Sequence, residues 1–213
     1  MSRRVAPLTL DSLDDLPTRC RGCVFWELDP VGAARAERSG DPSFEKEAWL
    51  SEALLEWGSV GRIAYVDDVP AGYVSYASPH LVPRSVAFPT APVSADAALL
   101  MAVRVLPEFT GGGLGRMLVQ SAAKDLTRRG VRAIEAYGLE HLRAPEGDRY
   151  AGPDGCVVPA EFLRALGFKT VRPHHRHPRL RLELKNAISW REDVESAIER
   201  LLGSVRAPVL TGH

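Results

Sequence analysis

The sequence predicts a single α/β domain, and three observations indicate it. Short apolar runs typical of strands alternate with segments whose apolar side chains recur at helical spacing. Two of these runs, 61–66 and 72–77, are separated by a polar stretch typical of a hairpin turn. A third run, 99–106, leads through a cluster of glycines into a helical pattern. A chain of 213 residues is long enough to bury a sizeable core in one such domain.

The elements of the first half follow from local patterns. In chain order we expect a strand at Ala6–Leu10, a linker rich in small and charged residues at 29–42, a helix at Phe44–Trp57, the strands Gly61–Val66 and Gly72–Ala77, and a proline-rich loop at Pro79–Pro92. The helix is indicated by apolar side chains near one side, with Ser43 in the N-cap position. The segment Asp67–Ala71 supplies the turn of the hairpin.

The second half is assigned in the same way. We expect a strand ending at Val105, a helix from Leu114 to Gly130, a strand at Val131–Tyr137, a long loop at Gly138–Val158, a short helix at Pro159–Leu166, a strand pair at Phe168–Val171 and Leu180–Leu184, and an amphipathic helix at Glu192–Leu202 followed by a loose tail. Leu114, Leu118 and Leu126 carry the helical period. Proline suits the first position of the short helix.

Composition narrows the class of partner. The chain has 27 basic and 27 acidic residues and a formal net charge of zero, which argues against nucleic acid or an anionic membrane. No apolar run approaches the length of a membrane span, and no signal-peptide stretch follows the N-terminal residues. Three cysteines do not form a disulfide framework. We therefore expect a cytoplasmic protein.

The glycine cluster is the most informative part of the chain. Gly111, Gly112, Gly113 and Gly115 lie between the apolar run and the helix that starts at Leu114. Free N–H groups at a helix start, without side chains in the way, bind anions. Neither the P-loop pattern nor the dinucleotide pattern G-x-G-x-x-G fits, because Arg116 follows the last glycine. The turn predicts a phosphate-bearing ligand of another kind.

The turn resembles motif A of the GCN5-related N-acetyltransferases (GNAT), V-x-V-x-P-x-x-R/Q-x-x-G-x-G/A. Val103, Val105, Pro107, Gly113 and Gly115 are in register with it. Thr110 stands where the family usually has arginine or glutamine, although its hydroxyl can still donate a hydrogen bond. The pair Gly167-Phe168 resembles the end of the family's second motif, and the order of elements matches from Ala6 to Leu184.

The resemblance implies a fold and a co-substrate. It implies a mixed, mostly antiparallel sheet flanked by helices and splayed between its fourth and fifth strands, in a domain at 1–186 with a C-terminal helix and tail at 187–213. It implies acyl-CoA as co-substrate, most simply acetyl-CoA, and no metal is expected. The implied CoA-binding residues are Val103, Arg104, Val105, Thr110, Gly111, Gly112, Gly113, Leu114, Gly115 and Arg116. Pantetheine would run along the strand and pyrophosphate would lie on the glycines. For Arg116, a phosphate contact and a solvated surface arginine are both open.

The implied activity is direct N-acyl transfer to a small-molecule or peptide amine. The family's usual catalytic groups are missing, since 97–102 holds no carboxylate and Leu163 occupies the position of the usual tyrosine. Three interpretations stay open. Other residues act as acid and base, proximity and water suffice, or the chain is a catalytically silent acyl-CoA-binding or regulatory protein.

Five residues are candidates for the missing chemistry. Glu27, beside Trp26, could bind or deprotonate a cationic amine with cation–π help, or be a surface glutamate beside a core tryptophan. Glu140 and His141 could supply a base, or be a loop surface pair. Cys156 could protonate the leaving thiolate or be acylated, or be a buried inert cysteine, and Tyr150 is a comparable acid.

Cys20-x-x-Cys23 also has the spacing of half a zinc site. Cys156 or the histidines His174, His175 and His177 could complete it, but no matched second pair is present. A redox-active pair is disfavoured because no thioredoxin-like strand precedes these cysteines. This segment and the last helix are alternatively a surface for a protein partner or a homodimer.

Overall fold

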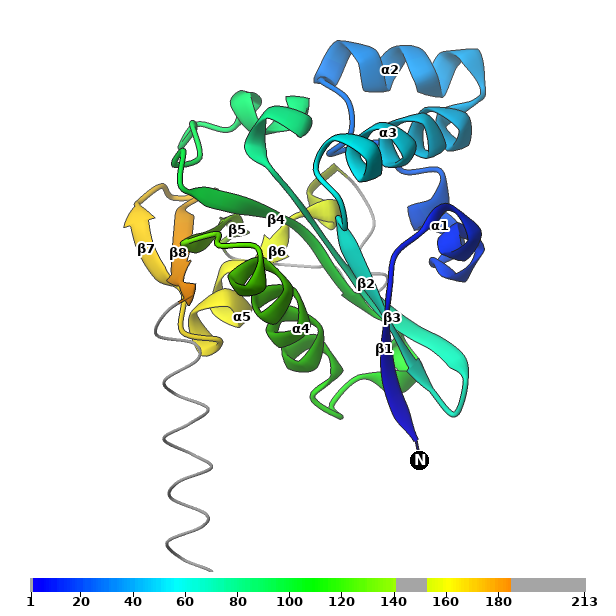
Figure 1. The fold of residues 1–213 in the computed structure, drawn as a ribbon. Helices are drawn as coiled ribbons and strands as arrows, with labels where there is room; N and C mark the ends of the chain where they lie inside the picture. The colour runs from blue at the N-terminus through cyan, green and yellow to red at the C-terminus, as the bar shows by residue number, and fades with distance from the viewer. Residues whose placement is uncertain (1, 141–152, 185–213) are drawn as a thin grey trace, which may run out of the picture.

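A mixed sheet forms the centre of the fold in the computed structural model, which describes residues 2–140 and 153–184 (Figure 1). Within these residues eight strands pair in the order β1-β2-β3-β4-β5-β8-β7, and β6 pairs with β5. Their bounds are β1 Arg3–Pro7, β2 Gly61–Val66, β3 Val69–Ala77, β4 Ala97–Val105, β5 Ala133–Leu139, β6 Val158–Pro159, β7 Lys169–Arg172 and β8 Arg179–Glu183. The pairs β4–β5 and β5–β6 are parallel and the others are antiparallel.

The sheet opens between β4 and β5. These strands pair only where Ala97–Leu99 meets Ala133–Glu135. From there to Val105, β4 is paired on its β3 side alone, whereas β5 continues beside β8 and β6. The predicted mixed, mostly antiparallel sheet with a splay between its fourth and fifth strands is therefore confirmed.

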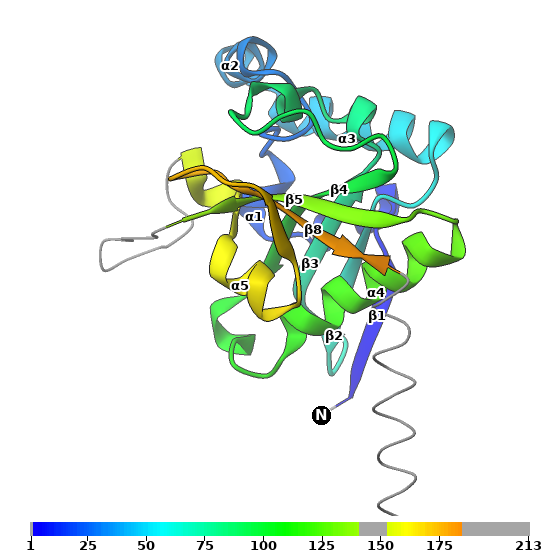
Figure 2. The same cartoon turned by 90° about the vertical axis from the view of Figure 1, so that its left-hand side faces the viewer.

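Helices cover both faces of the sheet. The bounds are α1 Thr18–Arg21, α2 Pro30–Ser39, α3 Pro42–Glu56, α4 Leu114–Arg128 and α5 Ala160–Ala165. Figure 1 and Figure 2 show α4 and α5 on one side of the strands and α2 and α3 on the other. In β4 the side chains alternate: Leu99 and Met101 join the cluster that contains α3 residues, while Leu100 joins the cluster around α4. The burial of both faces explains why this strand is a continuous apolar run.

The predicted linker at 29–42 is wrong, because α2 fills most of it. The side chain of Asp29 accepts hydrogen bonds from the N–H groups of Val31 and Gly32, at 2.8 and 3.0 Å, and Pro30 occupies the first turn. Alanine, arginine and glutamate then favour a helix. Gly40, at φ +83°, ends it in the left-handed conformation. The small and charged residues of this segment thus form a helix, with Asp29 capping its N-terminus and Gly40 its C-terminus.

The other strands and helices expected within the described residues agree in type and shift at their ends, and most of the expected loop at 138–158 lies outside the described residues. The hairpin turn is only Asp67-Asp68, both at positive φ, so β3 begins earlier than expected. The first strand lies at Arg3–Pro7 rather than Ala6–Leu10, and residues 10–15 form a 3-10 turn. The predicted helix at 192–202 and the boundary at residue 186 lie outside the described residues. No helix in the described part of the chain is long and apolar enough to cross a membrane.

The cap of α3 is Asp41 and not the predicted Ser43. The Asp41 carboxylate accepts the Phe44 N–H at 3.0 Å. We expect Asp41→Ala to lower the free energy of unfolding by about 1 kcal/mol, measured by urea denaturation followed by circular dichroism. Ser43→Ala, two residues away on the same turn, should change it by less than about 0.5 kcal/mol. Equal losses in the two variants would contradict this assignment of the cap.

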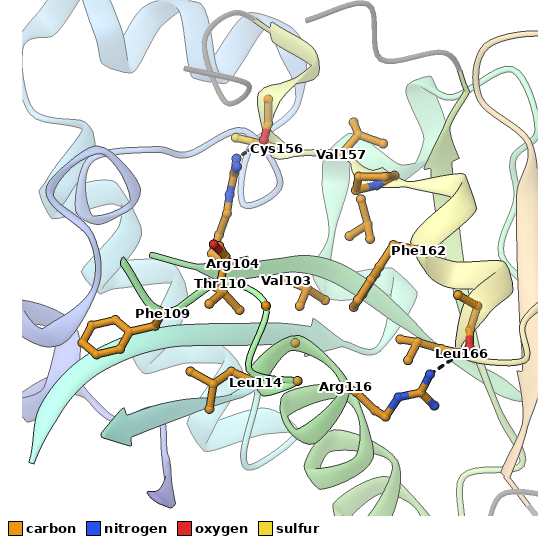
Figure 3. A pocket seen from close by; sticks show the side chains of 18 residues that line it. Val103, Arg104, Phe109, Thr110, Leu114, Arg116, Cys156, Val157, Phe162 and Leu166 are labelled. Carbon is orange, nitrogen blue, oxygen red and sulfur yellow. Dashed lines mark hydrogen bonds between the residues drawn. The ribbon is translucent and has the colours of Figure 1, made fainter. Parts of the chain in front are cut away.

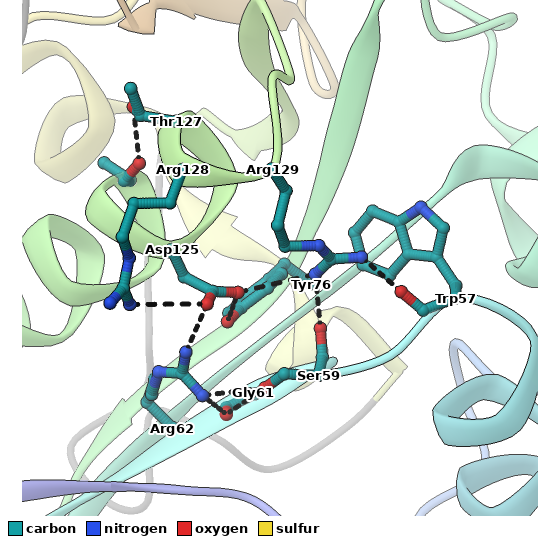
Figure 4. Close-up of polar contacts among 10 residues, drawn as sticks. Trp57, Ser59, Gly61, Arg62, Tyr76, Asp125, Thr127, Arg128 and Arg129 are labelled. Atoms are coloured by element: carbon teal, nitrogen blue, oxygen red, sulfur yellow. Dashed lines mark hydrogen bonds and ion pairs between the residues drawn. The ribbon is translucent and has the colours of Figure 1, made fainter.

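Asp125 anchors the C-terminal part of α4 to the sheet (Figure 4). Its carboxylate lies 2.6 Å from the Arg62 guanidinium of β2 and accepts the Tyr76 hydroxyl of β3 at 2.9 Å. Arg129 adds a contact at 3.4 Å, and its guanidinium lies 3.8 Å from the centre of the Trp57 ring. Asp125, Arg62 and Tyr76 are all buried. Arg128 lies 3.6 Å away on the exposed side of the helix, so this charged group is held by three cations and a hydroxyl.

Candidate active site

A groove with a volume of about 380 Å³ lies at the open edge of β4 (Figure 3). One wall is the end of β4, the glycine turn and the start of α4, and the other is the segment from Gly155 to Leu166. Nine of the ten residues predicted to bind CoA line it, namely Val103, Arg104, Val105, Thr110, Gly111, Gly113, Leu114, Gly115 and Arg116. The exception is Gly112, whose carbonyl accepts a hydrogen bond from Arg3 at 2.7 Å.

The start of α4 offers unpaired N–H groups to this groove. Gly113 is the N-cap, at φ +78°, and no side chain caps the helix. The N–H of Met117 makes the first hydrogen bond of the helix, to the Gly113 carbonyl at 3.1 Å. The N–H groups of the preceding residues have no partner inside the helix. Because Leu114 and Gly115 line the groove, these donors and the positive end of the helix dipole lie beside it.

Gly115 allows the helix start to approach the opposite wall. A Cβ atom at this position would lie 3.1 Å from Cζ of Phe162, which is closer than ordinary packing permits. Phe162 belongs to α5, so this glycine sets the width of the groove between the two helices. The sequence indicated the glycine but not its partner, because aromatic residues in a short helix carry no pairing signal.

The polar side chains along the groove have protein partners. The Thr110 hydroxyl donates to the Pro107 carbonyl at 2.8 Å, and Arg116 donates to the Ala165 carbonyl at 3.2 Å. The guanidinium of Arg104, a buried residue, donates to the Gly155 carbonyl across the end of the groove. The glycine turn therefore presents mainly backbone to the cavity, and Arg104 holds the two walls together.

A second pocket adjoins the first. It has a volume of about 470 Å³ and is lined by Pro17, Thr18, Arg19, Cys20, Cys23, Arg104, Val105, Leu106, Pro107 and Cys156. Arg104, Val105 and Cys156 line both cavities. Cys156 thus lies at the junction between the groove and a separate pocket. The sequence alone did not predict the position of this second pocket.

A sequence model of the acetyltransferase (GNAT) family matches residues 34–144, more than half of the 213-residue chain. The chain belongs to the GNAT family. A comparison with curated protein sequences finds no match. The family resemblance carried by the glycine turn is therefore confirmed. The residues of that turn line the groove described above.

Solved structures of two N-acetyltransferases and of a GNATL domain are similar in fold to this chain. The PaiA N-acetyltransferase from Thermoplasma acidophilum, in complex with coenzyme A, has a TM-score of 0.55 and 16% identity over 86% of this chain and 99% of that chain. The N-acetyltransferase from Staphylococcus aureus Mu50 has a TM-score of 0.53 and 11% identity over 86% and 99%. The loading GNATL domain of CurA from Lyngbya majuscula has a TM-score of 0.51 and 14% identity over 87% and 100%. At these identities the likeness is one of fold.

Trp26 and Glu27 lie in the interior of this GNAT protein. The Trp26 ring is buried and stacks on Phe88 with a centroid distance of 5.3 Å. Glu27 is only 5% exposed, and its carboxylate lies 2.5 Å from Nζ of Lys46, which is also buried. Burial lowers the pKa of Lys46, but the charge and hydrogen bond of Glu27 outweigh this and raise it above its usual value. Trp26 is thus a core residue, as the second interpretation of the sequence expected. Glu27 is not the surface residue of that interpretation, because it is buried and lies in a turn.

The other catalytic candidates differ in what surrounds them. Glu140 follows β5 and forms a two-pronged ion pair with Arg164 of α5, which raises the pKa of that arginine. His141 and Tyr150 lie outside the described residues. Leu163, at the family's tyrosine position, is fully buried in the core. Of the candidates described, only Cys156 lines the groove.

No group of three or more histidine, cysteine, aspartate or glutamate side chains within the described ranges is arranged to hold a metal ion. His174 instead accepts backbone hydrogen bonds from Arg176 and His177, at 3.2 and 3.0 Å, in the turn between β7 and β8. Cys20, Cys23 and Cys156 all line the second pocket, but within the described residues they are not arranged to hold a metal ion.

The contact between Cys23 and Cys156 is the feature that sequence reasoning missed. Sγ of Cys23 lies 3.2 Å from Sγ of Cys156, 133 positions away in the chain. The hydrogen bond from Cys156 lowers the pKa of Cys23 to about 6, helped by the Phe25 N–H and opposed by burial. The same bond, together with burial, raises the pKa of Cys156. The sequence offered Cys156 only as one possible further ligand of a zinc site at Cys20 and Cys23, and it did not indicate a direct contact between Cys23 and Cys156.

Alkylation of Cys23 should report this low pKa. Only the thiolate reacts, so we expect its rate of reaction with iodoacetamide to fall as the pH drops through about 6, whereas an ordinary thiol loses reactivity near pH ~8.5. In Cys156→Ala the midpoint should rise, because the main stabilising hydrogen bond is gone. Cleavage by trypsin after Arg21 places Cys20 and Cys23 on separate peptides for mass spectrometry. An unchanged midpoint in the variant would contradict the role of Cys156.

Proposed function

We propose that this GNAT protein is an acyl-CoA-dependent N-acyltransferase that moves an acyl group, in the simplest case acetyl, directly onto an amine. One observation carries the proposal: beyond Leu99 the open edge of β4 leads into an uncapped helix N-terminus along a single groove. A thioester of coenzyme A has an amide-bearing arm and a pyrophosphate. The groove offers strand backbone for the first and helix N–H groups for the second, in the same order.

The nine predicted residues that line the groove keep their roles in this proposal, and Gly112 stays a candidate for its main-chain N–H only. Val103, Arg104 and Val105 present the free backbone edge of β4 to the pantetheine amides. Gly111 to Gly115 surround the pyrophosphate with main-chain donors, and the lack of side chains leaves room for it. Thr110 and Arg116 donate to backbone carbonyls in this structure, at 2.8 and 3.2 Å, and could exchange those bonds for phosphate oxygens.

The second pocket is the proposed acceptor site. It meets the groove at Arg104, Val105 and Cys156, so a thioester at the end of the groove and an amine in the pocket would come together there. Holding both reactants in a ternary complex converts a bimolecular reaction into an effectively intramolecular one. We infer a small-molecule or peptide amine, because the pocket is a separate cavity of about 470 Å³ beside the groove.

Cys156 has the strongest geometric support among the catalytic candidates. It lies at the junction of the two cavities, where a thiol could protonate the departing thiolate. Glu27 and Glu140 are each held by a cation, Lys46 and Arg164, which favours a structural role over proton transfer. His141 and Tyr150 stay candidates. The attacking amine must be neutral, and water or one of these groups would take its proton.

A catalytically silent acyl-CoA-binding protein is the second candidate function. It is favoured by a specific observation: within the described residues, no carboxylate lines either the groove or the second pocket. The two carboxylates that the sequence offered are engaged in ion pairs. Such a protein would keep the donor groove and use it to sense acyl-CoA.

Two measurements on the purified protein separate these functions. Isothermal titration with acetyl-CoA tests the groove, and failure to bind would overturn both proposals. Release of the CoA thiol is then followed with a panel of small amines and of peptides that have a free N-terminal amine. The measured rate is corrected for hydrolysis of acetyl-CoA without an acceptor. Turnover that depends on an amine supports the transferase. Binding without turnover on every acceptor supports the sensor.

A further inference from the structure

Two thiols from distant parts of the chain are held next to each other at the edge of the second pocket. Cys23 follows α1 and Cys156 precedes β6, yet their Sγ atoms are 3.2 Å apart. Each backbone is fixed by a side chain from the other side of the site. Lys46 donates to the Cys23 carbonyl at 2.8 Å, and the Trp26 indole donates to the Cys156 carbonyl at 3.0 Å. The Trp26 bond ties the Cys156 backbone to the segment that carries Cys23, and the Lys46 bond fixes that segment to α3.

The contact between the two sulfurs makes their titration unequal. The hydrogen bond between Cys23 and Cys156 lowers the pKa of Cys23 to about 6, which favours the thiolate form of Cys23. The positive charge of Lys46 favours the thiolate as well. Both cysteines are half-buried and both line the second pocket, which gives a small reagent a route to them. A nucleophilic thiolate beside a second thiol is the arrangement that thiol–disulfide exchange requires.

We propose that Cys23 and Cys156 form a reversible intrachain disulfide by exchange with a low-molecular-weight disulfide of the glutathione type. The two sulfurs need to approach by only about 1.2 Å to reach the S–S bond length of about 2.05 Å. The bond would fasten the wall of the groove at Gly155–Cys156 to the turn that follows α1. It would also remove both thiols from the second pocket, including Cys156 at the junction of the two cavities.

The disulfide forms in two successive thiol–disulfide exchange steps. First, the Cys23 thiolate attacks one sulfur of oxidised glutathione, forms a mixed disulfide and expels one glutathione thiolate. The charge that held the proton on Cys156 is then gone, so Cys156 passes its proton to solvent or to the expelled thiolate. Its sulfur next attacks Cys23 and expels the second glutathione thiolate. Two protein thiols are oxidised, and one small disulfide is reduced to two thiols.

The competing partner for Cys23 is Cys20, three residues earlier. Cys20 lies in α1, and its thiol is hydrogen-bonded with the hydroxyl of Tyr73. The sulfur beside Cys23 belongs to Cys156. The fold therefore favours a crosslink over a span of 133 residues in place of the local one that the CxxC spacing suggests.

The test uses the full-length protein, first reduced with dithiothreitol, freed from it and then exposed to oxidised glutathione. Remaining thiols are blocked with N-ethylmaleimide before denaturation and mass spectrometry. We expect one blocked thiol in place of three, on Cys20, and a tryptic crosslink between the Cys23 and Cys156 peptides. Dithiothreitol should restore three thiols. The result does not depend on any acyl-transfer activity, so its failure is distinct from failure of the proposed function.

Matched variants make the assignment specific. Cys20→Ser should crosslink as fully as the natural chain, and Cys23→Ser or Cys156→Ser should yield no crosslinked peptide. Three blocked thiols after exposure, glutathione retained on Cys23, or a crosslink between Cys20 and Cys23 would each overturn the proposal. The peptide map of the unsubstituted chain decides the question even if one of the serine variants fails to fold.

Discussion

Acetyl-CoA should bind the Gly115→Glu variant about 100-fold more weakly than it binds the natural chain, or not measurably. The substitution places a carboxylate beside the helix N–H groups that the proposed function assigns to the pyrophosphate. Loss of about two charge-assisted hydrogen bonds, each worth about 1.5 kcal/mol, corresponds to this factor. Repulsion between the carboxylate and the phosphates adds to the loss, since both are partly shielded from water in the groove.

Steric and electrostatic effects at Gly115 can be separated. Gly115→Ala adds only a Cβ, which would lie 3.1 Å from the Phe162 ring, and should weaken binding less than the glutamate does. Gln120→Glu adds the same charge to an exposed position of α4 that does not line the groove, and should leave the dissociation constant within about twofold. Isothermal titration measures all three, with circular dichroism as the check on folding. An equal loss in Gln120→Glu would show a long-range charge effect and would contradict the proposed binding of the pyrophosphate at the start of α4.

Much of this site was predictable because it is local in the sequence. The strand that ends at Val105, the glycine turn and the helix from Leu114 follow one another in a single run, so period and turn chemistry fix their order. That stretch carried most of the family resemblance, with Gly167-Phe168 and the order of elements in support, and the family match then confirmed it. Main-chain donors also need no side-chain identity, so the departure at Thr110 does not alter the groove.

The rest of the site depends on contacts that no local pattern encodes. Trp26 and Glu27 were candidates for an amine site because aromatic and acidic neighbours suit one, and in the fold Trp26 stacks on Phe88 while Glu27 pairs with Lys46. Both partners come from other elements, and only the tertiary fold brings them there. The Cys23–Cys156 pair is hidden for the same reason, since 133 positions separate its members. The missed helix α2 differs, because its cap Asp29 and its stop Gly40 were visible locally.

Asp125→Ala should lower the free energy of unfolding by about 3–5 kcal/mol, the loss typical of breaking a buried charge pair by removing one partner. The variant leaves the buried Arg62 guanidinium without its 2.6 Å partner and the Tyr76 hydroxyl without its acceptor (Figure 4). Burial already raises the pKa of Tyr76 to about 12, so ionisation gives that hydroxyl no alternative at neutral pH. The unsatisfied groups, and not the lost attraction alone, account for the size of the effect.

The matched control for this carboxylate is its most exposed partner. Arg128 lies 3.6 Å from Asp125 with its side chain 67% exposed, so Arg128→Ala should cost less than about 1 kcal/mol in the same urea titration. Asp125→Asn keeps an acceptor for Tyr76 and should fall between the two. Since α4 rises about 1.5 Å per residue, the anchor lies far along the helix from the glycine turn. Asp125→Ala should therefore still bind acetyl-CoA at temperatures where it is folded, and a loss of binding there would mean that Asp125 positions the groove as well as the fold.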